Sequence, residues 1–179
     1  MPGRLKQFAF LTSALLGFLL LPQTSLAATL FLSPASGSFP VGATFKVGVR
    51  TNTAGQAANT AESTVTYDSN VIEIVSVAPG STFTLQTPGS PSKSGGTAFF
   101  SAGIPTPGYN GSSGSLGVIT FRAKAEGTAS VSVSSGKVLL NDGNGTDALS
   151  GTSGGNYTIT APAVGAPAGE PLPQLAGVS

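Results

Sequence analysis

The stretch VTYDSNVIEIVSV, from Val65 to Val77, contains the features that decide the fold. It begins with the alternation of a half-buried strand, passes through Asp68-Ser69-Asn70, and continues into a β-branched run. Asp and Asn favour turns because their side chains bond to nearby backbone groups. The stretch therefore predicts a strand, a tight turn that Asp68 opens, and a second strand.

Similar strand patterns lie on both sides of this stretch. In VITFRAKA, from 118 to 125, period-two alternation points Phe121 to one face and Arg122 to the other. In TAFFSAG, Phe99 and Phe100 must point to opposite faces, so one of them needs cover from a loop or a partner. The other segments with strand patterns are TFKVGVR (44–50), STVTY (63–67), ASVSVSS (129–135) and NYTIT (156–160). With no helical stripe after residue 27, the chain is predicted to be all-β: an antiparallel β-sandwich or jelly roll of roughly eight to ten short strands.

The two ends of the chain differ from this central part. Residues 1–27 have the pattern of a signal peptide: Arg4 and Lys6, an apolar stretch, and a small-x-small site ending at Ala27. The apolar stretch is shorter than a membrane span of roughly 20 residues, although an uncleaved anchor is the alternative. Residues 161–179 are rich in Pro, Ala and Gly and are predicted to be a linker or tail. We expect cleavage after Ala27, a secreted protein with no membrane span, and one domain over residues 28–160.

The composition of the chain argues against several classes of binding partner and against disulfide bonds. The chain has eight Lys and Arg against seven Asp and Glu, and loss of Arg4 and Lys6 would leave six against seven, or about −1. A nearly neutral chain without a basic patch is not expected to bind nucleic acid or an anionic membrane surface. There is no cysteine, so the domain must rely on its core rather than on disulfides.

Enzymatic activity is not expected. The chain has no histidine and no cysteine, which removes most pairs of nucleophile and base. Glycosidases need two facing carboxylates, and the few acidic residues fall in predicted turns or on solvated strand faces. The composition therefore favours a binding module over an enzyme.

Three segments, in the same order along the chain, resemble the cohesin domain family. They are YDSNVIEIVSVAPG (67–80), GSLGVITFRAKA (114–125) and LLNDGNGTDAL (139–149), and the resemblance covers residues 29–160. It implies a jelly-roll sandwich of about nine strands that is related to certain carbohydrate-binding modules. It also implies a non-catalytic module that docks a dockerin-bearing protein in an extracellular assembly, either polysaccharide-related or at the cell surface.

The candidate docking residues lie on the strand before Asp68. If Val65 points inward, alternation turns Thr60, Glu62, Thr64 and Thr66 outward. Many cohesins carry an Asn-x-Asp pair on the corresponding strand, and the resemblance places that pair at Thr60 and Glu62. An acidic residue, Glu62, stands at the Asp position, whereas Thr60 stands at the Asn position.

Two other functions remain open on sequence alone. One is direct carbohydrate binding, for which Tyr109 is the candidate, because it is the one tyrosine predicted to lie in a loop. The other is a structural subunit of a surface layer or pilus. A polysaccharide partner therefore remains an alternative to a protein partner.

No metal or other cofactor is expected. Asp142, Asn144 and Asp147 form an oxygen-rich segment that makes Ca²⁺ the alternative, since Ca²⁺ prefers oxygen ligands. An EF-type loop starting at Asp142 would need an acid where Ser153 stands. A glycine-rich hairpin is the preferred interpretation of this segment.

Overall fold

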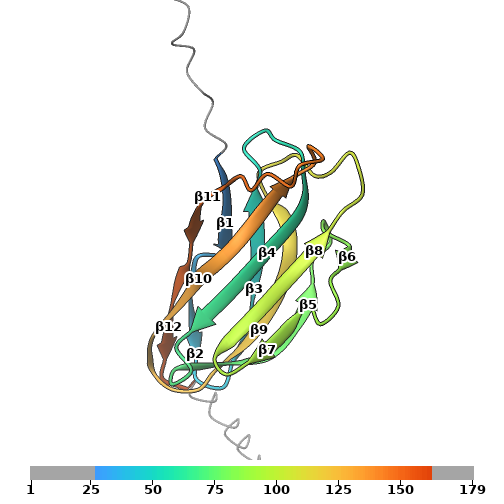
Figure 1. The fold of residues 1–179 in the computed structure, drawn as a ribbon. Helices are drawn as coiled ribbons and strands as arrows, with labels where there is room; N and C mark the ends of the chain where they lie inside the picture. The colour runs from blue at the N-terminus through green and yellow to red at the C-terminus, as the bar shows by residue number, and fades with distance from the viewer. Residues whose placement is uncertain (1–26, 163–179) are drawn as a thin grey trace, which may run out of the picture.

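The computed structural model describes residues 27–162, which form a sandwich of two β-sheets (Figure 1). One sheet has five strands, in the spatial order β11 (Leu149–Ser153), β1 (Ala28–Ser33), β3 (Thr44–Asn52), β9 (Gly114–Ala123) and β5 (Ile72–Pro79). The other has seven: β2 (Ser36–Pro40), β12 (Gly155–Thr160), β10 (Gly127–Leu140), β4 (Ala58–Tyr67), β8 (Thr97–Gly103) and β6 (Leu85–Gln86), with β7 (Ser92–Ser94) also paired to β8. No helix that the structure describes is long and apolar enough to span a membrane.

The all-β sandwich is confirmed, but the strand count and two strand directions differ from the expectation. The described residues hold twelve strands instead of about nine, and β1 pairs with β11 and β2 with β12 in parallel. The parallel pairs arise because the first and last segments each cross from one sheet to the other. These crossings and the short strands β6 and β7 raise the strand count. The second crossing passes Gly154, where a Cβ would overlap the Val131 carbonyl group, so only glycine fits.

The Val65–Val77 stretch joins the two sheets. Its first strand, β4, lies in the seven-stranded sheet, and its second strand, β5, lies in the five-stranded sheet. Asp68 opens the turn as predicted: its Oδ1 accepts the Asn70 N–H at 2.9 Å, and its carbonyl accepts the Ile72 N–H at 3.1 Å. The stretch is thus a crossover between layers and not a hairpin.

The core fills the space between the sheets and follows the predicted alternation. Phe45 and Phe121 are buried, with ring centroids 5.6 Å apart, and the Phe45 ring lies 5.2 Å from that of Tyr157. The Tyr157 hydroxyl donates to the Pro34 carbonyl at 2.7 Å, and burial raises the pKa of Tyr157 to about 12. This aromatic group packs together strands from both sheets.

The two adjacent phenylalanines of β8 separate as their alternation requires. Phe100 points inward and is 1% exposed, while Phe99 is only partly buried. The Phe100 ring lies against Gly117 of β9, where a Cβ would overlap it. The missing side chain of Gly117 therefore lets the two sheets approach each other over Phe100.

Candidate functional site

The outer face of the seven-stranded sheet carries the predicted docking residues. Thr60, Glu62, Thr64 and Thr66 of β4 are all partly exposed, and they alternate with buried residues of the same strand. Strand β4 lies between β10 and β8, so the row runs along the middle of this sheet (Figure 1). We call the outward surface of β10, β4 and β8 the seven-stranded face.

The strand register shows which residues accompany this row. Glu62 lies opposite Lys137 of β10 on one side and opposite Ser101 of β8 on the other. Glu62 and Lys137 form no ion pair with each other. Among the described residues, the single ion pair joins Arg122 and Glu73. The two charges at the middle of the face are thus free to meet a partner.

Three apolar residues lie beside this row, and the sequence analysis missed two of them, Leu85 of the neighbouring strand β6 and Leu139 of β10. Phe99 lies opposite Thr64. Leu85 is 57% exposed and is separated from Thr60 by one residue, because Gly103 of β8 pairs with Leu85 on one side and with Thr60 on the other. Thr60 lies opposite Leu139 on its other side. Neither Leu85 nor Leu139 stands in a segment with a signal for binding, so only the strand register could place them beside the row.

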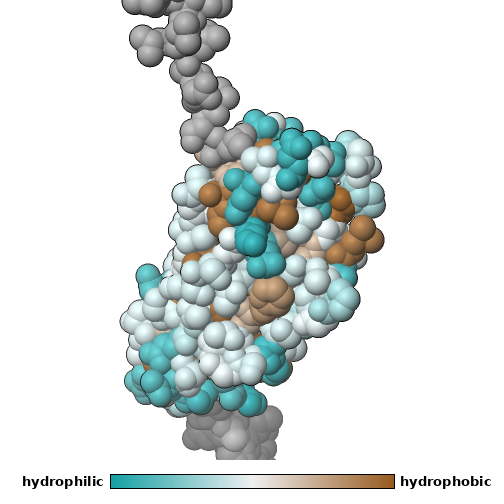
Figure 2. Space-filling model, viewed as in Figure 1, coloured by the Kyte–Doolittle hydropathy of each residue, from teal (hydrophilic) through white to brown (hydrophobic). Residues whose placement is uncertain are grey.

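The seven-stranded face has no broad apolar area. Figure 2 shows a mostly pale surface, with teal and brown patches scattered over it. Because most of its outward side chains are Thr and Ser, the face is short-chained and offers hydroxyl groups rather than a deep pocket. Such a surface suits a macromolecular partner better than a small ligand.

The structure places Tyr109 in the loop before β9, partly buried against the core. Its ring lies against Gly114 and meets the buried ring of Phe83 edge-on, with centroids 5.9 Å apart. Its hydroxyl accepts the Ser113 N–H at 3.1 Å. No large aromatic side chain is exposed in the described residues, so no second ring joins Tyr109 in a sugar-binding platform.

The structure brings Asp142 and Asn144 together in one turn and places Asp147 apart from them. Asp142 Oδ1 accepts the N–H groups of Asn144 and Gly145 at 2.8 and 3.1 Å. A hydrogen bond from the Thr146 side chain, with that of the Asn144 N–H, holds the pKa of the Asp142 carboxyl below its ordinary value. Asp147 Oδ1 instead accepts the Val138 and Leu149 N–H groups, at 3.1 and 3.0 Å. Both carboxylates thus accept hydrogen bonds from backbone N–H groups. Residues 27–162 contain no cluster of three metal-ligating side chains.

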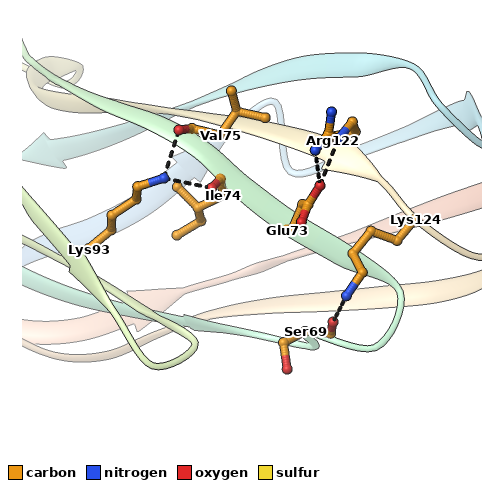
Figure 3. A network of polar contacts seen from close by, with 7 residues as sticks. All are labelled: Ser69, Glu73, Ile74, Val75, Lys93, Arg122 and Lys124. Carbon is orange, nitrogen blue, oxygen red and sulfur yellow. Dashed lines mark hydrogen bonds and ion pairs between the residues drawn. The ribbon is translucent and has the colours of Figure 1, made fainter.

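Polar contacts of a different kind hold the edge strand β5 (Figure 3). Lys93 Nζ donates to the carbonyls of Ile74 and Val75, at 2.9 and 2.7 Å, where β5 has a bulge. Glu73 pairs with Arg122 of β9 at 2.5 Å. These charged groups are engaged within the domain, unlike Glu62 and Lys137.

The fold is an all-β sandwich. Its candidate site is the seven-stranded face, a flat surface formed by neighbouring strands. The family model for the cohesin domain matches residues 29–160. The chain therefore belongs to the cohesin domain family. A search of curated proteins found no match.

Several solved cohesins have the same fold. The sixth cohesin of scaffoldin B from Acetivibrio cellulolyticus, solved with a mutant Cel5 dockerin, is 20% identical with a TM-score of 0.58, over 75% of this chain and 99% of that chain. The cohesin of OlpC from Clostridium thermocellum, also solved with a dockerin, is 15% identical with a TM-score of 0.58, over 76% and 94%. A non-cellulosomal cohesin from the hyperthermophilic archaeon Archaeoglobus fulgidus is 20% identical with a TM-score of 0.56, over 75% and 92%.

Proposed function

We propose that this chain is a non-catalytic docking module that binds a dockerin-bearing protein through the seven-stranded face. Membership of the cohesin family carries the proposal. Solved relatives from Acetivibrio cellulolyticus and Clostridium thermocellum support it, because they are complexes of a cohesin with a dockerin.

The chemistry of the seven-stranded face supports its choice as the docking surface. Its Thr and Ser side chains lose little conformational entropy when a partner orders them. Glu62 and Lys137 have no ionic partner in the described residues, so each can form a charge-assisted hydrogen bond across an interface. Leu85 adds an exposed apolar contact beside Thr60.

The setting that fits this function is outside the cell, in a polysaccharide-related or cell-surface assembly. The support is the signal-peptide pattern of residues 1–27, which lie almost wholly outside the described residues. Intact-mass measurement of protein from the culture medium tests this, and a chain that begins at Ala28 is the expected result. Recovery of the full-length chain from membranes would favour the uncleaved anchor instead.

Titration calorimetry against a panel of purified dockerin modules tests the docking itself. For a dockerin that binds, Glu62→Lys should weaken binding by at least about tenfold, because the reversed charge is desolvated in the interface. Glu126→Lys is the matched control: it makes the same charge change at an exposed residue before β10, away from the row, and should leave binding unchanged.

Tyr109→Ala separates the protein-docking proposal from the carbohydrate alternative. Docking on the seven-stranded face predicts that this variant binds dockerin normally. If no dockerin binds, and a polysaccharide binds in a manner that Tyr109→Ala abolishes, the carbohydrate-binding function replaces the one proposed here.

A further inference from the structure

The described chain contains two Asn-Gly pairs, Asn110-Gly111 and Asn144-Gly145. In such a pair the backbone nitrogen of the glycine can attack the Cγ of the asparagine. The new N–C bond closes a cyclic imide, and the side-chain nitrogen leaves as ammonia with the proton from the glycine nitrogen. Water then opens the imide to aspartate or isoaspartate. Glycine favours this reaction because it has no side chain to hinder the approach and permits unusual backbone angles.

Distant partners hold both reacting groups of Asn110-Gly111. The Gly111 N–H donates to the hydroxyl of Thr53 at 3.0 Å, and its carbonyl accepts the Thr53 N–H at 2.9 Å. The side-chain amide of Asn110 donates to the Gly55 carbonyl at 3.0 Å. Because Thr53 is fully buried, ring closure at Asn110 would require this loop to detach from the core.

Asn144-Gly145 lies in a different environment, in the exposed turn between β10 and β11. Both residues are exposed, and Gly143 and Gly145 both have positive φ, of 76° and 68°. Within residues 27–162, no hydrogen bond holds the side-chain amide of Asn144. The Gly145 N–H has one local partner, the Asp142 carboxylate at 3.1 Å.

We propose that Asn144 is a site of spontaneous deamidation in this protein, and that the Asp142 carboxylate sets its rate. The carboxylate accepts a hydrogen bond from the attacking nitrogen of Gly145. Its negative charge opposes the loss of the proton from that nitrogen. Water is the only co-reactant, so an exposed turn supplies everything the reaction needs.

The modification would alter the turn that connects β10 to β11. It adds a negative charge next to Asp142, and isoaspartate also lengthens the backbone by one carbon atom. The turn is closed by the Leu140 N–H, which donates to the Thr146 carbonyl at 2.9 Å. Leu139 precedes this turn and lies opposite Thr60, so the change occurs at the rim of the seven-stranded face.

Peptide mapping of the full chain after incubation at mildly alkaline pH tests the proposal. Fragmentation mass spectrometry should place the mass gain of amide-to-acid conversion at Asn144, with Asn110 unchanged. Asp142→Ala should accelerate the conversion about fivefold, since the nitrogen then reacts without first breaking a hydrogen bond to a charged acceptor. Asp142→Ser, whose hydroxyl can still accept the bond without the charge, should give an intermediate rate.

Two controls make the result specific. Thr53→Val removes the hydroxyl that holds Gly111 and should allow conversion at Asn110 to begin. Circular dichroism of each variant shows whether the sheet is intact. Conversion at Asn110 before Asn144 in the parent chain, or an unchanged rate at Asn144 in both Asp142 variants, would overturn the proposal.

Discussion

Two neighbouring strands of the five-stranded sheet and two of the seven-stranded sheet supply the core unequally. Strands β3 and β9 of the five-stranded sheet contribute large side chains, among them Phe45, Ile119 and Phe121. Strands β4 and β8 contribute mainly small ones, and Phe100 is the exception. The buried residues of β4 and β8 are Ala58, Ala61, Ser63, Val65, Ala98, Phe100, Ser101 and Ala102.

This difference separates the parts of the domain that stabilise it from the part that is available for docking. The free energy of burial scales with apolar area, so β3 and β9 carry more of it than β4 and β8. Strands β4 and β8 have little buried bulk of their own, and most of their outward side chains are short and polar. We therefore expect changes on that face to alter binding far more than folding.

Phe121→Ala tests the large-residue side of this comparison. Phe121 is fully buried and contacts both Phe45 and Tyr67, whose ring centroids lie 5.6 and 5.4 Å from its own. Truncation should lower the free energy of unfolding by about 3–5 kcal/mol, as measured by urea denaturation. Phe99→Ala on the seven-stranded face is the control and should cost much less. Equal losses for the two variants would break the comparison.

Tyr157 of β12 is a large buried residue of the seven-stranded sheet, in contrast to the small residues of β4 and β8, and its burial gives a pH-dependent test. Its pKa of about 12 lies above the ordinary value of 10.0, so the folded state keeps a proton that the unfolded state loses. The free energy of unfolding should therefore be insensitive to Tyr157 below about pH 10 and should fall by roughly 2–3 kcal/mol as the pH rises to about 12. Tyr157→Phe should lack this fall in a series of urea denaturations at increasing pH. A parallel decline in both proteins would show that another group is responsible.

Gly117→Ala tests the place where the two kinds of strand meet. The added methyl group would overlap the buried Phe100 ring, and overpacking of this kind should cost about 1–3 kcal/mol in thermal or urea unfolding. Phe100→Leu in the same chain should restore part of the loss, because the smaller side chain leaves room. A double variant no more stable than Gly117→Ala alone would contradict the contact.

Ser63→Ala tests the small-residue side and should stabilise the domain. The Ser63 hydroxyl is buried and has no hydrogen-bond partner, so its removal relieves a desolvation cost of about 1 kcal/mol. Ser101→Ala is the matched control. Its hydroxyl is within hydrogen-bond distance of that of Thr87, at 2.9 Å, and its loss should destabilise by about 0.5–1.5 kcal/mol. A loss of stability for Ser63→Ala in urea denaturation would show that the Ser63 hydroxyl is satisfied.

Much of the fold could be predicted from alternation alone, because a strand with one buried face must place large apolar residues at every second position. The inward position of Phe121 and the opposed pair Phe99 and Phe100 are of this kind. The crossings of the first and last segments could not be predicted. A segment interrupted at Pro34 or Gly154 has the same local pattern whether it stays in one sheet or changes to the other.

The candidate site was predictable only in part for a related reason. The row on β4 follows from one strand, so its outward positions could be predicted. Lys137 and Leu85 come from strands far away in the sequence and depend on the register, which a single sequence does not contain. The three-residue strand β7 is too short to give a period-two pattern.

The position of Lys93 bears on how this protein behaves at high concentration. An edge strand such as β5 exposes carbonyl groups that can accept a strand from another molecule, which is a route to aggregation. Lys93 already occupies two of those carbonyls with its ammonium group, and the bulge at Ile74 interrupts the regular spacing that a new strand would need. The β5 edge of the five-stranded sheet is thereby a poor acceptor for a strand from another molecule, whereas the docking proposed here uses the surface of the other sheet.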